Sequence, residues 1–88
     1  MEVELIIDII GNKRYYINGT YIFHRDDGPA IEYTDGYKVW YQYDKLHRLD
    51  GPAIECTGGN KEWYYHNKYI DVDNQHDFEK ILALKAFW

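Results

Sequence analysis

Cysteine and methionine are almost absent from this chain of 88 residues, which contains one cysteine, Cys56, and a methionine only at its first position. A single cysteine excludes a disulfide within the chain, so we expect a reducing compartment. The first residues lack the basic segment of a signal peptide, and no apolar run approaches the roughly 20 residues that a membrane-spanning helix needs. The sequence therefore predicts a soluble cytoplasmic protein.

Basic residues are also scarce relative to acidic ones, 10 against 15, which gives a net charge of −5. Proteins that bind nucleic acid directly present clustered lysine and arginine to the phosphates, and the sequence has no such cluster. Direct nucleic-acid binding is therefore not expected. An acidic protein is better suited to a basic partner, such as a nucleic-acid-binding protein.

Aromatic side chains, by contrast, are abundant: ten Tyr, three Trp and three Phe make up 18% of the residues. A chain of this length forms a single domain, residues 1–88, whose core has to be thin. Aromatic side chains bury a large area at low conformational cost. We therefore expect them to supply much of that core.

A nine-residue motif occurs twice, as HRDDGPAIE at residues 24–32 and as HRLDGPAIE at residues 47–55. The two copies are 23 residues apart, and the match continues at the same offset as far as Trp40 and Trp63. A fixed period of this kind is typical of a repeat architecture. We predict an N-terminal hairpin at 3–17, repeat units at about 18–41 and 42–64, and a terminal half-unit at 65–72.

Each unit has the pattern of a β-hairpin, with strand-forming residues on both sides of a turn signal. The predicted two-residue turns are Ile10-Gly11, Asp35-Gly36 and Gly58-Gly59. This register pairs an aliphatic residue with an aromatic one in every hairpin: Ile6 with Tyr15, Ile31 with Trp40, and Ile54 with Trp63. Both tryptophans are therefore expected to be buried and equivalent.

The chain ends in a segment with helical periodicity, predicted as a helix over 74–87. Asn74 is placed to cap this helix, and its apolar positions are Phe78, Ile81, Leu82, Leu84, Phe87 and Trp88. The helix would cover the open end or one face of the sheet, or dock on a second copy of the chain. The expected fold class is mainly β, an antiparallel β-hairpin repeat meander with a C-terminal α-helix.

The HRxDGPA motif contains residue types that serve acid–base or phosphate chemistry in other proteins. Its Asp-Gly-Pro segment is nevertheless a turn sequence, and a motif that occurs once per unit is expected to hold neighbouring units together. We predict a structural role and no catalysis. The alternative is contact with an anionic ligand through His24, Arg25, His47 and Arg48. The four histidines, His24, His47, His66 and His76, lack the spacing of a metal site, and no cofactor is expected.

Four tyrosines, Tyr41, Tyr43, Tyr64 and Tyr65, follow successive strands and cannot all point inward. Tyrosine is enriched at protein interfaces, because it offers contact area and a hydrogen bond at low entropic cost. In the predicted register Glu32 faces Val39, Ile7 faces Arg14, and Glu55 faces Glu62. The last is an unfavourable pair of like charges that would mark an acidic contact surface. The predicted partner-binding residues are therefore the four tyrosines with Glu55 and Glu62. The alternative is a solvated acidic face and a sheet covered on both sides.

The first strand is unusually apolar, since Asp8 is the only charged residue between positions 5 and 10. An exposed edge strand of this composition invites pairing with another chain. Either the C-terminal helix or a second copy has to cover it. We predict a homodimer through the first strand, the helix, or both.

These residues together resemble MORN-repeat proteins, whose short units form successive β-hairpins. The chain is more similar to a MORN-like variant with the pattern Trp-Tyr-x-Asn-Gly-Lys-x-His-Arg-x-Asp-Gly-Pro-Ala, common in small accessory proteins of tailed bacteriophages. Trp40-Tyr41 and residues 45–53 match this pattern, with Tyr43-Asp44 in place of Asn-Gly. The resemblance implies a protein-interaction scaffold, and an enzyme is not expected.

Two functional hypotheses follow. The first is a phage-type protein-binding module that inhibits a host defence protein, or acts as its decoy, in the host cytoplasm. The alternative is a sponge that sequesters a small anionic ligand such as a signalling nucleotide. The net charge of −5 favours the first, because a nucleotide sponge needs local positive charge.

Overall fold

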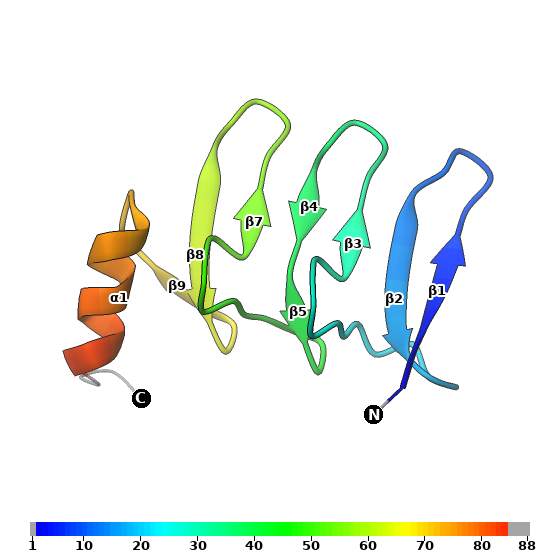
Figure 1. Cartoon of the computed structure of the whole chain (residues 1–88), viewed down its shortest axis with the longest axis horizontal. Helices are drawn as coiled ribbons and strands as arrows, with labels where there is room; N and C mark the ends of the chain where they lie inside the picture. The colour runs from blue at the N-terminus through cyan, green and yellow to red at the C-terminus, as the bar shows by residue number, and fades with distance from the viewer. Residues whose placement is uncertain (1, 85–88) are drawn as a thin grey trace.

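The computed structural model describes residues 2–84 and is mainly β, an antiparallel meander of strands followed by one C-terminal helix (Figure 1). Its elements are β1 (Val3–Ile7), β2 (Lys13–Ile17), β3 (Ile31–Glu32), β4 (Lys38–Val39), β5 (Tyr41–Gln42), β6 (Lys45–Leu46), β7 (Ile54–Glu55), β8 (Lys61–Tyr65), β9 (Lys68–Ile70) and α1 (Gln75–Leu84).

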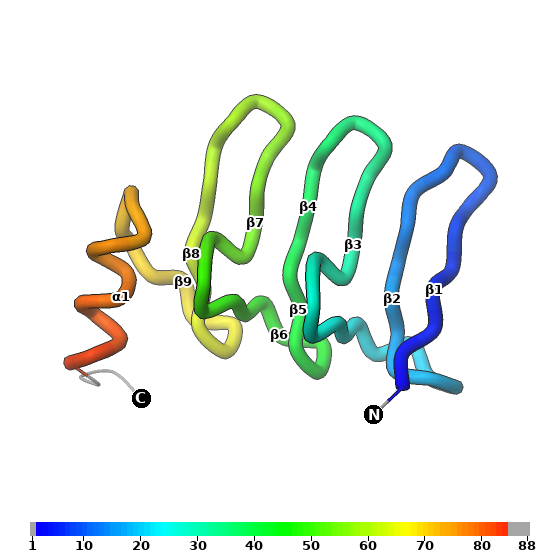
Figure 2. Tube along the Cα trace, viewed as in Figure 1, coloured from blue at the N-terminus to red at the C-terminus, as the bar shows by residue number. Residues whose placement is uncertain are grey.

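Seven strands form one antiparallel sheet in the order β1-β2-β3-β4-β7-β8-β9, and β5 pairs with β6 in a separate ladder. The hairpins β1–β2, β3–β4 and β7–β8 stand side by side, and the chain passes along the row once (Figure 2). The molecule measures 41 × 31 × 17 Å. Its short third dimension leaves room for little more than one layer of side chains on each face.

The hairpins β1–β2, β3–β4 and β7–β8 close with three-residue loops instead of the predicted two-residue turns. In β3–β4, the Gly36 N–H donates to the carbonyl of Tyr33 (3.0 Å), and the Tyr33 N–H donates to the carbonyl of Tyr37 (2.9 Å). The same two bonds close the loops at 9–11 and 57–59. Gly36 has a φ of +97°, as the last residue of such a loop requires, and glycine adopts it without strain.

The additional loop residue shifts every cross-strand pair by one position, so the predicted register is wrong. The observed partners are Leu5 with Tyr15, Ile31 with Val39 and Ile54 with Glu62, instead of Ile6 with Tyr15, Ile31 with Trp40 and Ile54 with Trp63. The acidic side chains change partners too. Glu32 faces Lys38 and Glu55 faces Lys61, and Ile7 faces Lys13, so the predicted pairs Glu32–Val39, Glu55–Glu62 and Ile7–Arg14 do not form. The like-charge repulsion between Glu55 and Glu62 disappears with the register.

The two tryptophans differ in burial, although the sequence predicts that they are equivalent. Trp63 is 4% exposed and packs in a core cluster with Ile70 and Phe78. Trp40 is only half-buried, and the guanidinium of Arg48 lies over its ring. The difference arises because α1 covers the last unit and leaves the preceding one uncovered.

Helix α1 begins after Asn74, as predicted, and is described as far as Leu84. The Asn74 side-chain oxygen accepts from the Asp77 N–H at 2.8 Å, which is the geometry of an N-cap. Phe78 is fully buried, and the predicted helical residues 85–87 lie outside the described part of the chain. Among residues 2–84, no helix is both long and apolar enough to cross a membrane.

The apolar first strand is exposed. Leu5, Ile6 and Ile7 are 43%, 45% and 55% exposed, and Ile9 in the following loop is completely exposed. Figure 1 shows α1 at the far end of the row, so its described part does not cover β1. The predicted homodimer remains the arrangement that would bury this strand.

Candidate functional site

Each HRxDGPA motif folds around its own arginine side chain. The guanidinium carbon of Arg48 lies 3.8 Å from the centroid of the Trp40 ring, the geometry of a cation–π contact. It also lies against Gly51, where a Cβ atom would come within 2.6 Å of it. The first copy repeats this arrangement with Arg25, Tyr15 and Gly28, at 4.0 Å and 2.9 Å. The motif therefore needs glycine because the guanidinium occupies the space of a side chain.

Each guanidinium also forms two ion pairs and one hydrogen bond to a backbone carbonyl within its motif, through its Nε and Nη1 atoms. Arg48 donates to Asp50 (2.9 Å), to the carbonyl of Pro52 (3.1 Å) and to Glu55 (3.0 Å). The corresponding partners of Arg25 are Asp27 (2.9 Å), Pro29 (3.1 Å) and Glu32 (3.2 Å). The hydrogen bond from Arg25 holds the pKa of Asp27 below its ordinary value of 3.8. We call each such set an arginine clamp, and it gives the motif a structural role.

The motif histidines support tight turns in the following hairpin. Tyr43 and Asp44 form a two-residue turn with positive φ at both positions, which is unfavourable for residues other than glycine. The Tyr43 N–H donates to Nδ1 of His24 at 3.0 Å. In the next unit the His66 N–H donates to Nδ1 of His47 at the same distance. Each histidine ring thus accepts from a turn at its Nδ1 and carries its proton on Nε2.

The two histidines differ at that second nitrogen. Nε2 of His24 lies 3.1 Å from Asp26, and the ring is 2% exposed. Leu49 occupies the position equivalent to Asp26, so Nε2 of His47 has no hydrogen-bond partner within residues 2–84. Burial, and secondarily the proximity of His66, lower the pKa of His47 below 6.5. His47 is therefore neutral at physiological pH, with an N–H group available to a ligand.

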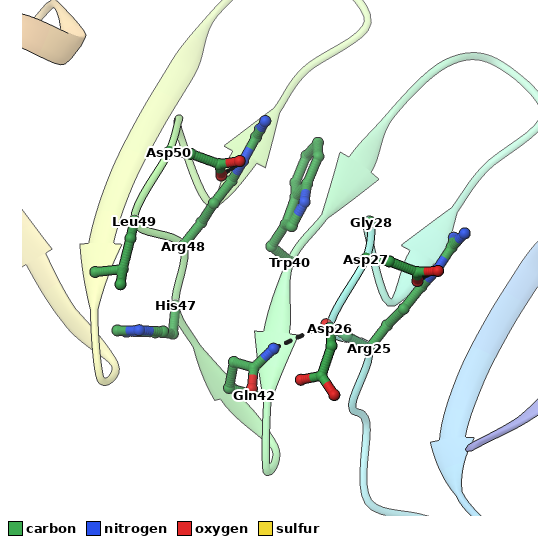
Figure 3. Close-up of a pocket in the computed structure, with 10 residues that line it drawn as sticks. All are labelled: Arg25, Asp26, Asp27, Gly28, Trp40, Gln42, His47, Arg48, Leu49 and Asp50. Atoms are coloured by element: carbon green, nitrogen blue, oxygen red, sulfur yellow. Dashed lines mark hydrogen bonds and ion pairs between the residues drawn. The ribbon is translucent and has the colours of Figure 1, made fainter. Parts of the chain in front are cut away.

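A groove of about 570 Å³ separates the two motifs (Figure 3). Trp40 stands between Gly28 of the first motif and Arg48 of the second, and Gln42 lies below it in Figure 3. The complete lining is Arg25, Asp26, Asp27, Gly28, Trp40, Gln42, His47, Arg48, Leu49 and Asp50. An anion in this groove would meet three carboxylates, and both arginines are already ion-paired. The groove is therefore poorly suited to the anionic ligand of the alternative hypothesis, and the fourth candidate contact, His24, is buried outside its lining.

The six predicted partner-binding residues do not gather on one surface. The Tyr64 hydroxyl donates to Glu62 at 3.3 Å, so these two lie on one face of β8. Tyr65 points to the opposite face and packs against the core beneath α1. Glu55 belongs to the second arginine clamp, and the half-exposed Tyr43 packs against the ring of His24.

The face that carries Tyr64 contains aromatic residues that the sequence analysis missed. Tyr16, Phe23 and Tyr41 stack in a row with centroid distances of 4.8 and 5.1 Å, and Tyr64 contacts Tyr69 at 5.5 Å. Burial is the main cause that raises the pKa of both Tyr41 and Tyr64, and Tyr37 lies close enough to each of them to contribute. We call this surface the tyrosine face: Tyr16, Phe23, Tyr37, Tyr41, Tyr64, Tyr69 and Glu62.

The position of α1 leaves the tyrosine face uncovered. The helix packs around Trp63 and Tyr65, which alternate along β8 with Tyr64. Because neighbouring residues of a strand point to opposite faces, the described helix lies on the other side of the sheet from Tyr64. The alternative that the helix covers the tyrosines therefore does not hold for Tyr41 and Tyr64.

Within residues 2–84, no group of three or more His, Cys, Asp or Glu side chains is arranged to hold a metal ion. Comparison with known proteins returns no match: no family model, curated protein or solved structure is significantly similar to this chain. The function has to be argued from the surfaces of the molecule itself.

Proposed function

We propose that this chain is a MORN-like protein-binding module of the phage type, which binds a host protein through its tyrosine face and thereby inhibits or sequesters it. The observation that carries the proposal is the tyrosine face itself, a row of half-exposed aromatic residues that α1 leaves uncovered. Tyrosine is enriched at such contact surfaces, where its ring supplies area and its hydroxyl a hydrogen bond.

The electrostatics of this face support a basic partner. Burial, with Glu62 as a further cause, raises the pKa of Tyr64 above its ordinary value of 10.0, so the hydroxyl stays protonated and donates to Glu62. The Glu62 carboxylate lies beside it, on a chain with a net charge of −5. Complementary charge accelerates association and excludes acidic competitors.

The alternative of catalysis has little support in the same geometry. The arginine and aspartate side chains of the motif are held in the arginine clamps, and the histidine Nδ1 atoms accept from turn amides. A catalytic group has to reach a substrate with a free functional atom. Binding is the activity that the exposed surfaces favour.

The test is recovery of a bound protein from bacterial host extract on the immobilised chain, followed by assay of that protein's activity. Serine substitutions at Tyr64 and Tyr69 should each weaken retention by about tenfold or more, as expected for tyrosines at the centre of an interface. Tyr43→Ser is the matched control, because Tyr43 is similarly exposed but lies outside the tyrosine face. Equal retention by all three variants would contradict the proposal.

A further inference from the structure

The C-terminal helix shows which chemical group fits beside the tryptophan of a unit. Oε1 of Gln75 accepts from the indole Nε1 of Trp63 at 2.8 Å. Nε2 of the same carboxamide donates to the backbone carbonyl of Leu49 at 2.9 Å. One glutamine side chain thus bridges the tryptophan of the second unit and the third residue of its HRxDGPA motif.

The equivalent atoms one repeat earlier have no hydrogen-bond partner in the described part of the chain. Counting back 23 residues from Trp63 and Leu49 gives Trp40 and Asp26, which both line the groove between the motifs. Within residues 2–84, neither Nε1 of Trp40 nor the carbonyl of Asp26 forms a hydrogen bond. The groove therefore presents the same donor and acceptor that Gln75 joins in the next unit.

The lining confirms that the two places correspond. Trp63, Tyr65, Ile70 and Val72 pack in one cluster with apolar residues of α1. Their counterparts 23 residues earlier are Trp40, Gln42, His47 and Leu49. All four counterparts line the groove. The tryptophan is retained, but Gln42 and His47 replace an aromatic and an aliphatic residue, so the groove is the more polar of the two sites.

We propose that this groove is a docking site for a glutamine side chain carried by a partner protein. The carboxamide oxygen accepts from Nε1 of Trp40 while its amino group donates to the carbonyl of Asp26. The site goes beyond the proposed function, because none of the residues that line the groove belongs to the tyrosine face.

Other side chains fit this groove less well. A glutamate lacks the amide donor and would bring its charge close to Asp26, Asp27 and Asp50. A leucine would leave the indole N–H and the carbonyl without partners while excluding water from them, which is unfavourable. A carboxamide is neutral and both donates and accepts hydrogen bonds. It can therefore bind the Asp26 carbonyl and the Trp40 indole N–H without repulsion from the carboxylates.

The experiment uses the full chain, labelled with ¹⁵N, and as the probe a capped peptide with the sequence of residues 73–79 in which Asp73→Ser, Asp77→Ala and Glu79→Ala remove the carboxylates that the groove would repel. The indole N–H resonance of Trp40, assigned with the Trp40→Phe variant, should shift in a saturable manner at millimolar peptide, the affinity expected of so small a ligand. Peptides carrying Gln75→Glu or Gln75→Leu should bind at least about tenfold more weakly. Trp40→Phe retains a ring for Arg48 but lacks the indole donor, so the backbone amide resonances of Gln42 and His47, which line the groove, should shift with peptide in the unsubstituted chain and not in this variant.

Three results would overturn the proposal. The first is an unmoved Trp40 resonance up to roughly 10 mM peptide, and the second is equal shifts with the glutamine and glutamate peptides. The third is a response confined to Trp63, which would mean that the peptide competes with α1 and does not bind the groove. Since this readout needs no host protein, its failure is distinguishable from failure of the proposed function.

Discussion

The two ends of the row of hairpins differ in whether their apolar side chains are buried. At the last hairpin, α1 packs Phe78 against Trp63 and both side chains are almost completely buried. At the first hairpin, Ile7 is 55% exposed and Ile9 completely exposed. A stack of units needs caps, because a terminal unit has no neighbour to bury its apolar face. One end supplies its own cap, and the other has no cap among residues 2–84.

The largest expected effect concerns the open end. If the first strands of two copies pair, light scattering at micromolar concentration should give twice the mass of one chain. Ile7→Lys places a charge at the exposed strand edge and should restore the mass of a single chain. Leu84→Lys on the exposed surface of α1 is the control that separates a strand interface from a helix interface. A single-chain mass for the unsubstituted protein at every concentration would contradict the dimer.

At the capped end, the effect is on stability. Trp63→Ala removes a buried aromatic side chain and should lower the free energy of unfolding by about 3–5 kcal/mol, measured by urea denaturation. Trp40→Ala should cost clearly less, because Trp40 is half-buried and solvent can fill the space. Trp63→Phe, which keeps an aromatic ring, provides a measurable value if Trp63→Ala does not fold. Equal losses of unfolding free energy at the two tryptophans would mean that packing of α1 on Trp63 does not make it more important for stability than Trp40.

Between the two ends, the arginine clamp can be tested with a single methyl group. Gly51→Ala forces the Arg48 guanidinium to move, because the new Cβ would lie 2.6 Å from its carbon atom. The expected loss of stability is about 1–3 kcal/mol in urea denaturation, typical of overpacking. Gly58→Ala is the control, since its Cβ would point into open space, and it should change stability by less than about 0.5 kcal/mol. Similar losses for the two variants would argue against the clamp.

The smallest expected effect is on the pH dependence of stability. Burial and His66 depress the pKa of His47, so the unfolded chain takes up its proton at a higher pH than the folded chain does. The contribution of His47 is therefore complete above about pH 6.5 and is lost as the pH falls through its lower folded value. Urea midpoints at about pH 7.5 and about pH 5 should differ less in His47→Gln than in the unsubstituted protein. An unchanged difference would show that His47 is not responsible.

The sequence predicted the hairpins, the positions of their turns and the helix cap, but neither the length of the three loops nor the register. Both a two-residue turn and a three-residue loop end in glycine with positive φ, so Asp35-Gly36 alone does not distinguish them. An error of one residue exchanges the two faces of a strand. For this reason the sequence predicts a pair of Glu55 with Glu62, whereas in the structure Glu55 faces Lys61 and binds Arg48.

The aromatic residues missed at the candidate surface are brought together by contacts that the predicted hairpin pairs do not include. Tyr69 joins Tyr64 through the β8–β9 pairing, and Tyr16 joins Tyr41 through a stack with Phe23. The sequence did contain a signal for Tyr16. Residues 11–15 match residues 36–40, and this match makes Tyr16 the counterpart of Tyr41. The unequal burial of the tryptophans could not be read from the repeat, because it depends on where α1 packs.

The arginine clamps have a consequence for how such a chain can change in length. Each clamp is completed by residues of its own unit and the aromatic residue of the preceding strand, so the molecule is assembled from modules that contact only their neighbours. Tandem duplication of residues 42–64 would insert one whole module, with its own clamp, tryptophan and histidine-supported turn. The row of hairpins would then lengthen in fixed increments, with both ends of the chain unchanged.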